Sequence, residues 1–224
     1  MKAFILILVI SWLHAIGYSQ NNISYQIELG PSLTVPKISY GSLLFGNVKF
    51  NGNSYLGYDL KLGIRKDLNN FGIGITTGYL YSRYGYDSNE LIFPEDAANG
   101  TASTLNADNR VQAIPFGLLL RYYLSQSGFY VETGPVAEVE ISNKSHQEIH
   151  FGFDPGVIEI SDNKDQIYES GTKIGLNVFF GLKPEFSDFG FAIGLNYGLT
   201  QHKYYTTGWN IRPVRLQGLI SYNF

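Results

Sequence analysis

Apolar residues recur at every second position through almost the whole chain after residue 20. Period two is the repeat of a β-strand, whose successive side chains point to opposite faces. Eight segments show this repeat, at residues 24–36, 55–66, 71–84, 111–124, 129–141, 173–185, 189–200 and 212–224. No segment among them keeps the 3.6-residue period of an amphipathic helix. The sequence therefore predicts an all-β fold with eight strands.

The face opposite the apolar one combines glycine with charge. Thirteen strand glycines lie on it, and only Gly218 lies on the apolar face. The charged residues of this face are Glu28, Asp59, Lys61, Arg65, Arg121, Glu132, Glu138, Glu140, Lys173, Lys183 and Arg215. A soluble sheet favours Thr, Lys and Glu on its solvent face rather than repeated glycine. Glycine interleaved with charge fits a narrow polar lumen, with the apolar face turned to lipid, which predicts a transmembrane β-barrel.

The predicted connections alternate strictly between short and long. Short links fall at 67–70, 125–128 and 186–188, and long links at 37–54, 85–110, 142–172 and 201–211. Short periplasmic turns and long external loops alternate in this way in outer-membrane barrels. The pattern predicts an eight-stranded antiparallel up-and-down barrel with both strand termini on the periplasmic side.

The N-terminal segment has the features of a secretory signal peptide. Lys2 precedes the unbroken apolar run 3–10, and small residues, Gly17 and Ser19, stand before Gln20. The alternative is a membrane anchor, but the run is shorter than the roughly 20 residues that a spanning helix needs. We expect a signal peptide at 1–19 and a barrel domain at 20–224 outside the cytoplasm.

Composition excludes several classes of function. The 224 residues contain no Cys, which excludes a disulfide framework, a Cys nucleophile and a Cys-ligated metal. The formal net charge of −3 offers no electrostatic basis for nucleic-acid binding. No cofactor or metal site is predicted.

The predicted lumen charges nearly balance, with five acids and six bases. Hairpin register around the turn at 125–128 places Arg121 opposite Glu132. Glu138 and Glu140 face the same lumen as Lys173. Two interpretations fit: a gated ion path or proton relay, and a packed core of ion pairs. We favour the packed core, because unpaired buried charge is costly.

Signals for catalysis are weak. Ser142, Ser145 and His146 are close in sequence, and a lipid-modifying enzyme would need a Ser–His pair with an orienting acid. His146 and His150 could ligate a metal if their segment were helical, but a third ligand at diagnostic spacing is missing. We therefore do not expect an enzyme.

The third long loop carries apolar residues that a solvated loop does not require. Phe151, Phe153, Val157 and Ile158 form a candidate partner-binding segment. The run 156–160 could extend a strand above the membrane. Acidic residues in the second and third loops fit either a solvated surface or divalent cations that bridge lipopolysaccharide.

Three motifs carry a resemblance to a known family. Tyr222 and Phe224 end an alternating strand that resembles the C-terminal signature read by the barrel-insertion machinery. The runs 114–123 (IPFGLLLRYY) and 129–135 (FYVETGP) resemble consecutive strands of the Bacteroidetes outer-membrane β-barrel family, the PorT-like "porin family" group. The resemblance implies the bacterial outer membrane as location.

The expected function is that of a structural or interaction barrel, such as an accessory subunit of a secretion or insertion machine. A narrow channel or transporter is the alternative, and a lipid-modifying enzyme is less favoured. Expected partners are outer-membrane lipid, lipopolysaccharide, the insertion machinery and other envelope proteins.

Overall fold

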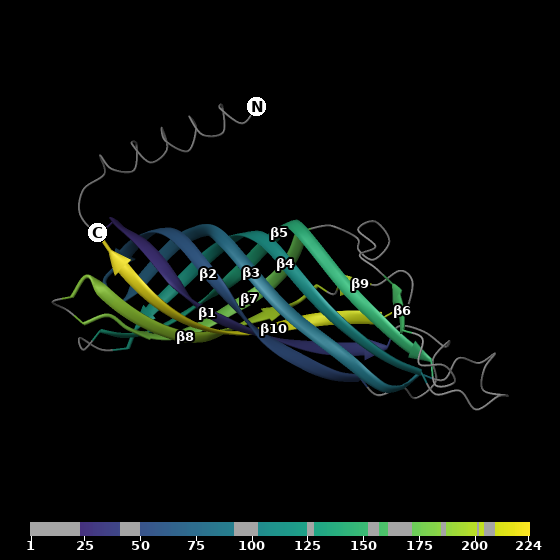
Figure 1. Cartoon of the computed structure of the whole chain (residues 1–224). Helices are drawn as coiled ribbons and strands as arrows, with labels where there is room; N and C mark the ends of the chain where they lie inside the picture. Colours follow the sequence, from purple (N-terminus) through teal and green to yellow (C-terminus); the bar gives the residue numbers. More distant parts are fainter. Residues whose placement is uncertain are drawn as a thin grey trace, which may run out of the picture.

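The computed structural model is a closed barrel of antiparallel strands (Figure 1). It describes residues 23–40, 50–91, 103–124, 128–151, 157–160, 172–184, 187–200, 202–203 and 209–224. The strands are β1 (Ile23–Tyr40), β2 (Phe50–Leu68), β3 (Phe71–Leu91), β4 (Ser103–Tyr123), β5 (Phe129–Phe151), β6 (Val157–Ile160), β7 (Thr172–Leu182), β8 (Phe189–Gly198), β9 (His202–Lys203) and β10 (Trp209–Asn223). The predicted signal peptide lies outside the described residues.

Eight long strands close the ring. They follow the order β1-β2-β3-β4-β5-β7-β8-β10, and β10 pairs with β1. The short strands β6 and β9 pair with β5 and β10 and lie outside this ring. Every pairing is antiparallel, and apart from the closing pair β1–β10 each joins successive strands of the ring, so the predicted up-and-down topology is confirmed. Within the described ranges, no helix is long and apolar enough to span a membrane.

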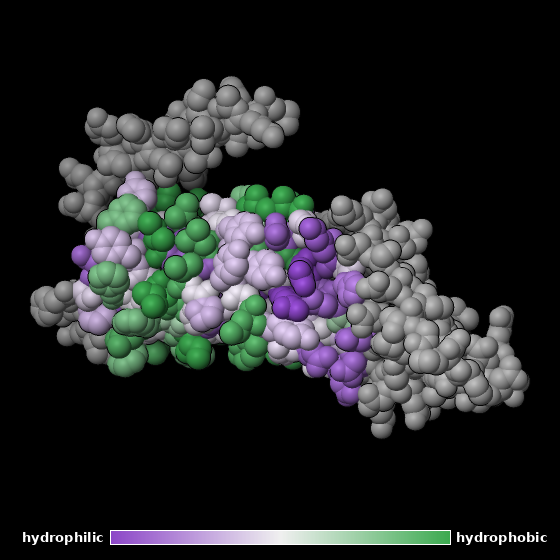
Figure 2. Space-filling view, in the orientation of Figure 1, coloured by the Kyte–Doolittle hydropathy of each residue, from purple (hydrophilic) through white to green (hydrophobic). Residues whose placement is uncertain are grey.

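Side chains alternate between the outside and the inside of this barrel as predicted. Apolar residues such as Leu29, Ile73 and Phe191 are 56%, 48% and 56% exposed on the outer wall. Polar residues between them are buried inside. Figure 2 shows apolar residues gathered on the half of the barrel nearer the C-terminus and hydrophilic residues toward the end with β6 and β9. The apolar half matches the band that contacts hydrocarbon in outer-membrane barrels.

The predicted boundaries on the outer side are wrong, because the strands continue far into the expected loops. β3 and β4 have 21 residues each and β5 has 23, whereas a membrane crossing needs about 9–11. Hydrophobic alternation reports only the part of a strand that borders lipid. Beyond the membrane both faces can be polar, while backbone hydrogen bonds still hold the ladder together. The barrel wall therefore projects well beyond the apolar band.

Candidate functional site

The eleven charged residues predicted for the lumen all lie on the inner face of the barrel. Eight are at most 9% exposed: Glu28, Asp59, Lys61, Arg65, Arg121, Glu132, Glu138 and Arg215. Glu140, Lys173 and Lys183 are partly exposed. The interior is therefore the first candidate for a functional site, and its contacts decide whether it is open or filled.

Arg121 and Glu132 form the ion pair that hairpin register predicts. The residues are direct partners on β4 and β5, and Arg121 Nη2 lies 2.6 Å from Glu132 Oε2. Arg121 Nε donates a hydrogen bond to the same oxygen at 2.8 Å. The guanidinium also stacks over the ring of Tyr130, 3.8 Å from its centroid. Both charged groups are buried, so each offsets the desolvation cost of the other.

A second cluster surrounds Arg65 near the periplasmic end. Arg65 Nε donates to Asp67 Oδ1 at 2.8 Å, and its Nη1 donates to Gln26 Oε1 at 2.8 Å. Tyr123 Oη donates to the same Asp67 oxygen at 3.4 Å from two strands away. Sequence reasoning missed Asp67, because its strand was predicted to end at residue 66. The odd-numbered residues of β2 face the lumen, so Asp67 should also have been placed inside. With Asp67 included, the predicted lumen contains six acidic and six basic residues.

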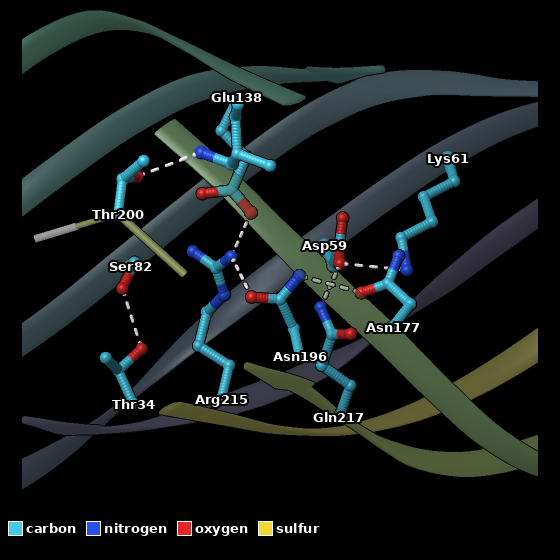
Figure 3. Close-up of polar contacts among 11 residues, drawn as sticks. Thr34, Asp59, Lys61, Ser82, Glu138, Asn177, Asn196, Thr200, Arg215 and Gln217 are labelled. Carbon is cyan, nitrogen blue, oxygen red and sulfur yellow. Dashed lines mark hydrogen bonds and ion pairs between the residues drawn. The ribbon is translucent and has the colours of Figure 1, made fainter. Parts of the chain in front are cut away.

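Polar contacts in the middle of the barrel bridge strands that are not neighbours in the ring (Figure 3). Lys61 Nζ lies 3.3 Å from Asp59 Oδ2, and Gln217 of β10 donates to that same oxygen. Lys61 also lies over the ring of Phe179, with Nζ 4.7 Å from the ring centroid. Lys61 is on β2 and Phe179 is on β7, four strands apart in a ring of eight. Opposite walls therefore touch at this level.

A second cross-lumen contact lies next to the first. Arg215 of β10 forms an ion pair with Glu138 of β5, three strands away around the ring. Arg215 also donates to Asn196 Oδ1 at 2.7 Å, and Asn196 Nδ2 donates to Asn177 Oδ1 at 2.7 Å. Glu138 and Lys173 are direct register partners, as expected from their shared face, and Glu138 also forms an ion pair with Arg215. These amides fill the space between the charged groups.

Apolar side chains share the interior with the charges. The aromatic residues Tyr84, Tyr130 and Phe179 lie in the lumen and are each 1% exposed. Aliphatic residues such as Leu80, Leu119, Val136 and Leu219 are also buried in the lumen. Charged residues and glycines were predicted for this face, but the alternation of each strand also turns these apolar residues inward. The interior is therefore packed by both ion pairs and hydrocarbon.

The candidate catalytic and metal-binding residues of the third loop lie on an extended strand, β5, and not on a loop or a helix. Ser145 is buried and the adjacent His146 is on the opposite face of β5, so the two side chains diverge. Ser142 and His146 share a face but lie about 13 Å apart along an extended strand. An i, i+4 spacing, such as that of His146 and His150, brings two ligands onto one face of a helix, but the backbone of both residues is part of strand β5. Within the described ranges, no cluster of metal-ligating residues occurs.

The candidate partner-binding segment lies at the outer end of the barrel. Phe151 ends β5, while Val157 and Ile158 belong to β6 and pair with residues 150 and 149 of β5. The predicted strand extension at 156–160 is therefore confirmed as β6. Phe153 lies outside the described residues.

The C-terminal aromatic residues lie on the outer wall at the opposite end. Phe224 and Tyr25 exchange backbone hydrogen bonds of 3.0 and 3.1 Å, and their rings stack with centroids 6.0 Å apart. Tyr222 packs against Phe189 at 5.1 Å. These contacts close the barrel at its periplasmic rim. A role in recognition by the insertion machinery stays a prediction.

Closure, an apolar outer belt and a polar interior together define the class of protein. A closed barrel satisfies all of its backbone hydrogen bonds in lipid, and only the membrane gives a stable environment to such an inverted distribution of side chains. The chain is a bacterial outer-membrane β-barrel protein with a filled lumen.

Comparisons with solved structures return other outer-membrane barrels. Neisserial surface protein A is 14% identical, with 88% of this chain and 97% of that chain covered and a TM-score of 0.36. OprG from Pseudomonas aeruginosa is 16% identical, with coverages of 92% and 97% and a TM-score of 0.48. The outer membrane protease OmpT from Escherichia coli is 12% identical, with coverages of 92% and 98% and a TM-score of 0.43. No family model and no curated protein matches the chain.

Proposed function

We propose that this protein is a plugged barrel that acts through its outer strands and loops as a structural or interaction component of the outer membrane. The observation that carries this proposal is the contact of Lys61 with Phe179 across the lumen. Arg215 and Glu138 add a second bridge between distant strands. Side chains that meet from opposite walls leave no continuous route for a sugar or peptide.

The proposal predicts that the purified barrel shows no stable conductance in planar bilayers. Replacing Lys61 by Ser and Phe179 by Ala together should open a path and produce discrete conductance steps. The matched control is Leu62→Ser with Phe180→Ala, which changes the neighbouring outward-facing positions and should leave the barrel closed. Single-channel recording measures all three proteins.

A large, reproducible and weakly selective conductance from the unmodified monomer would contradict the plugged barrel. It would favour the alternative function, a narrow channel or transporter. Equal conductance in the lumen variant and its outward-facing control would contradict the assignment of the plug to these two residues.

The interaction role predicts that the apolar segment at the outer end is needed for partner binding. Replacing Phe151, Phe153, Val157 and Ile158 by Ser should abolish cross-linking to a partner that the unmodified protein captures in native membranes. The control is Asn51→Ser with Asn53→Ser on the outer part of β2, which should keep the same partner. Quantitative mass spectrometry of cross-linked complexes gives the readout, and retention of that partner by the fourfold variant would refute the assignment.

The finer assignment is to the PorT-like barrel group, with the protein as an accessory subunit of an envelope assembly such as a secretion machine. It is supported by the motif at 114–123, which forms the membrane-spanning part of β4, and by the motif at 129–135 on the adjacent β5. The partner found by cross-linking tests this assignment directly.

A further inference from the structure

The cations Lys37, Arg83, Arg110 and Arg212 lie at about the same level of the outer wall, and Lys144 of β5 is the register partner of Arg110. Each of the first four lies 12 residues from an aromatic residue at the periplasmic end of the barrel, respectively Tyr25, Phe71, Tyr122 and Phe224. Twelve residues in strands tilted by about 40° span roughly 30 Å along the barrel axis, which is about the thickness of the hydrocarbon core. These cations therefore lie where the headgroups of the outer leaflet begin.

The four cations form two like-charge pairs across neighbouring strands. Arg83 and Arg110 are direct register partners on β3 and β4. Lys37 and Arg212 are direct register partners on β1 and β10. Like charges directly opposite each other destabilise a sheet, so each pair calls for an anion.

The first pair has an anion of its own in Asp108. Arg83 donates to the two carboxylate oxygens at 2.9 and 3.0 Å, and Arg110 donates to Oδ2 at 3.1 and 3.3 Å. Burial alone would raise the pKa of Asp108, but the hydrogen bonds from the two arginines outweigh it and lower that pKa. One carboxylate thus compensates both guanidinium groups.

The second pair has only a neutral partner. Arg212 Nη1 donates to Tyr197 Oη at 2.9 Å, and Lys37 is exposed beside them. The Nε of Arg212 is buried and has no hydrogen-bond partner among the described residues. Within the same ranges, neither Lys37 nor Arg212 forms an ion pair with a carboxylate. The wall immediately below is apolar, with Val35 and Leu195 39% and 44% exposed.

We propose that Lys37, Arg212 and Tyr197 bind the phosphate of an outer-leaflet lipid headgroup. The phosphate takes the place that Asp108 has in the first pair, since its oxygens accept from guanidinium, ammonium and hydroxyl donors at once. The lipid rather than a free anion is the source, because the cations lie at the edge of the apolar belt and the acyl chains continue along Val35 and Leu195.

The test measures binding of diphosphoryl lipid A, and of the same lipid after dephosphorylation, to the folded full barrel by native mass spectrometry. The unmodified protein should prefer the phosphorylated lipid by about tenfold, the effect of one charge-assisted contact. K37Q with R212Q should remove this preference, and K37Q alone should reduce it. R110Q is the matched control, since it removes a cation at the same level beside Asp108, and it should keep the preference.

Two results would overturn the proposal. One is an unchanged preference for phosphorylated lipid in K37Q with R212Q. The other is displacement of the lipid by excess inorganic phosphate, which would identify a site for soluble anions instead. If the double variant does not fold, K37Q alone decides the test. Lys37 is exposed, so K37Q should fold, and its preference for phosphorylated lipid should be reduced. Heat-dependent migration on unboiled gels verifies that each variant is folded.

Discussion

Replacing Glu132 by Leu should lower the free energy of unfolding by about 3–5 kcal/mol, the usual cost of breaking a buried ion pair. Glu132 is 3% exposed, and its Oε2 accepts a hydrogen bond from Arg121 Nε and lies 2.6 Å from Arg121 Nη2. The substitution leaves that guanidinium buried without its carboxylate. Urea unfolding of the barrel in lipid vesicles, followed by tryptophan fluorescence or gel mobility, measures the loss.

The companion variant Arg121→Met provides the control. Introduced together with Glu132→Leu, it removes the uncompensated charge and should recover part of the lost stability. A double-mutant cycle isolates the coupling between the two side chains. Additive effects of the two substitutions would show that the pair does not stabilise the barrel.

Gly134→Ala should prevent the barrel from folding. A Cβ atom at Gly134 would clash with the carbonyl oxygen of Leu118 and lie 2.9 Å from its carbonyl carbon. Both atoms belong to the backbone of β4, so the two strands would have to separate to relieve the clash. We expect a loss beyond about 4–5 kcal/mol, which few single substitutions reach. The fraction that shows the folded, heat-modifiable mobility after refolding measures the effect.

Gly218→Ala is the matched control on β10. A Cβ atom there meets nothing within 4 Å, because Gly218 faces outward. This variant should fold as well as the unmodified protein. Its free energy of unfolding should rise by about 0.4–1 kcal/mol, because alanine restricts the conformational freedom of the unfolded chain. Equal folding yields for the two alanine variants would contradict the close approach of β5 to β4.

Local pattern was sufficient to predict the membrane-spanning part of the fold. Alternation assigned each strand residue to the lipid or the lumen, and the short turn between β4 and β5 set the register that pairs Arg121 with Glu132. Both inferences depend only on residues close in sequence. The outer ends of the strands were missed because alternation disappears where neither face borders lipid, and a bulge at Ile141 shifts the faces of β5 beyond it.

The sequence by itself determined an inside-out barrel of eight strands and the pairs across adjacent hairpins, because side-chain parity and turn length set these locally. Only the tertiary structure decided which charges meet across the lumen. Arg215 finds Glu138, and Lys61 reaches Phe179, through contacts between strands that are not neighbours. Such contacts depend on the stagger and tilt with which the whole sheet closes, and strand number and shear determine these together. No single hairpin contains that information, so the filled lumen becomes visible only once β1 has paired with β10.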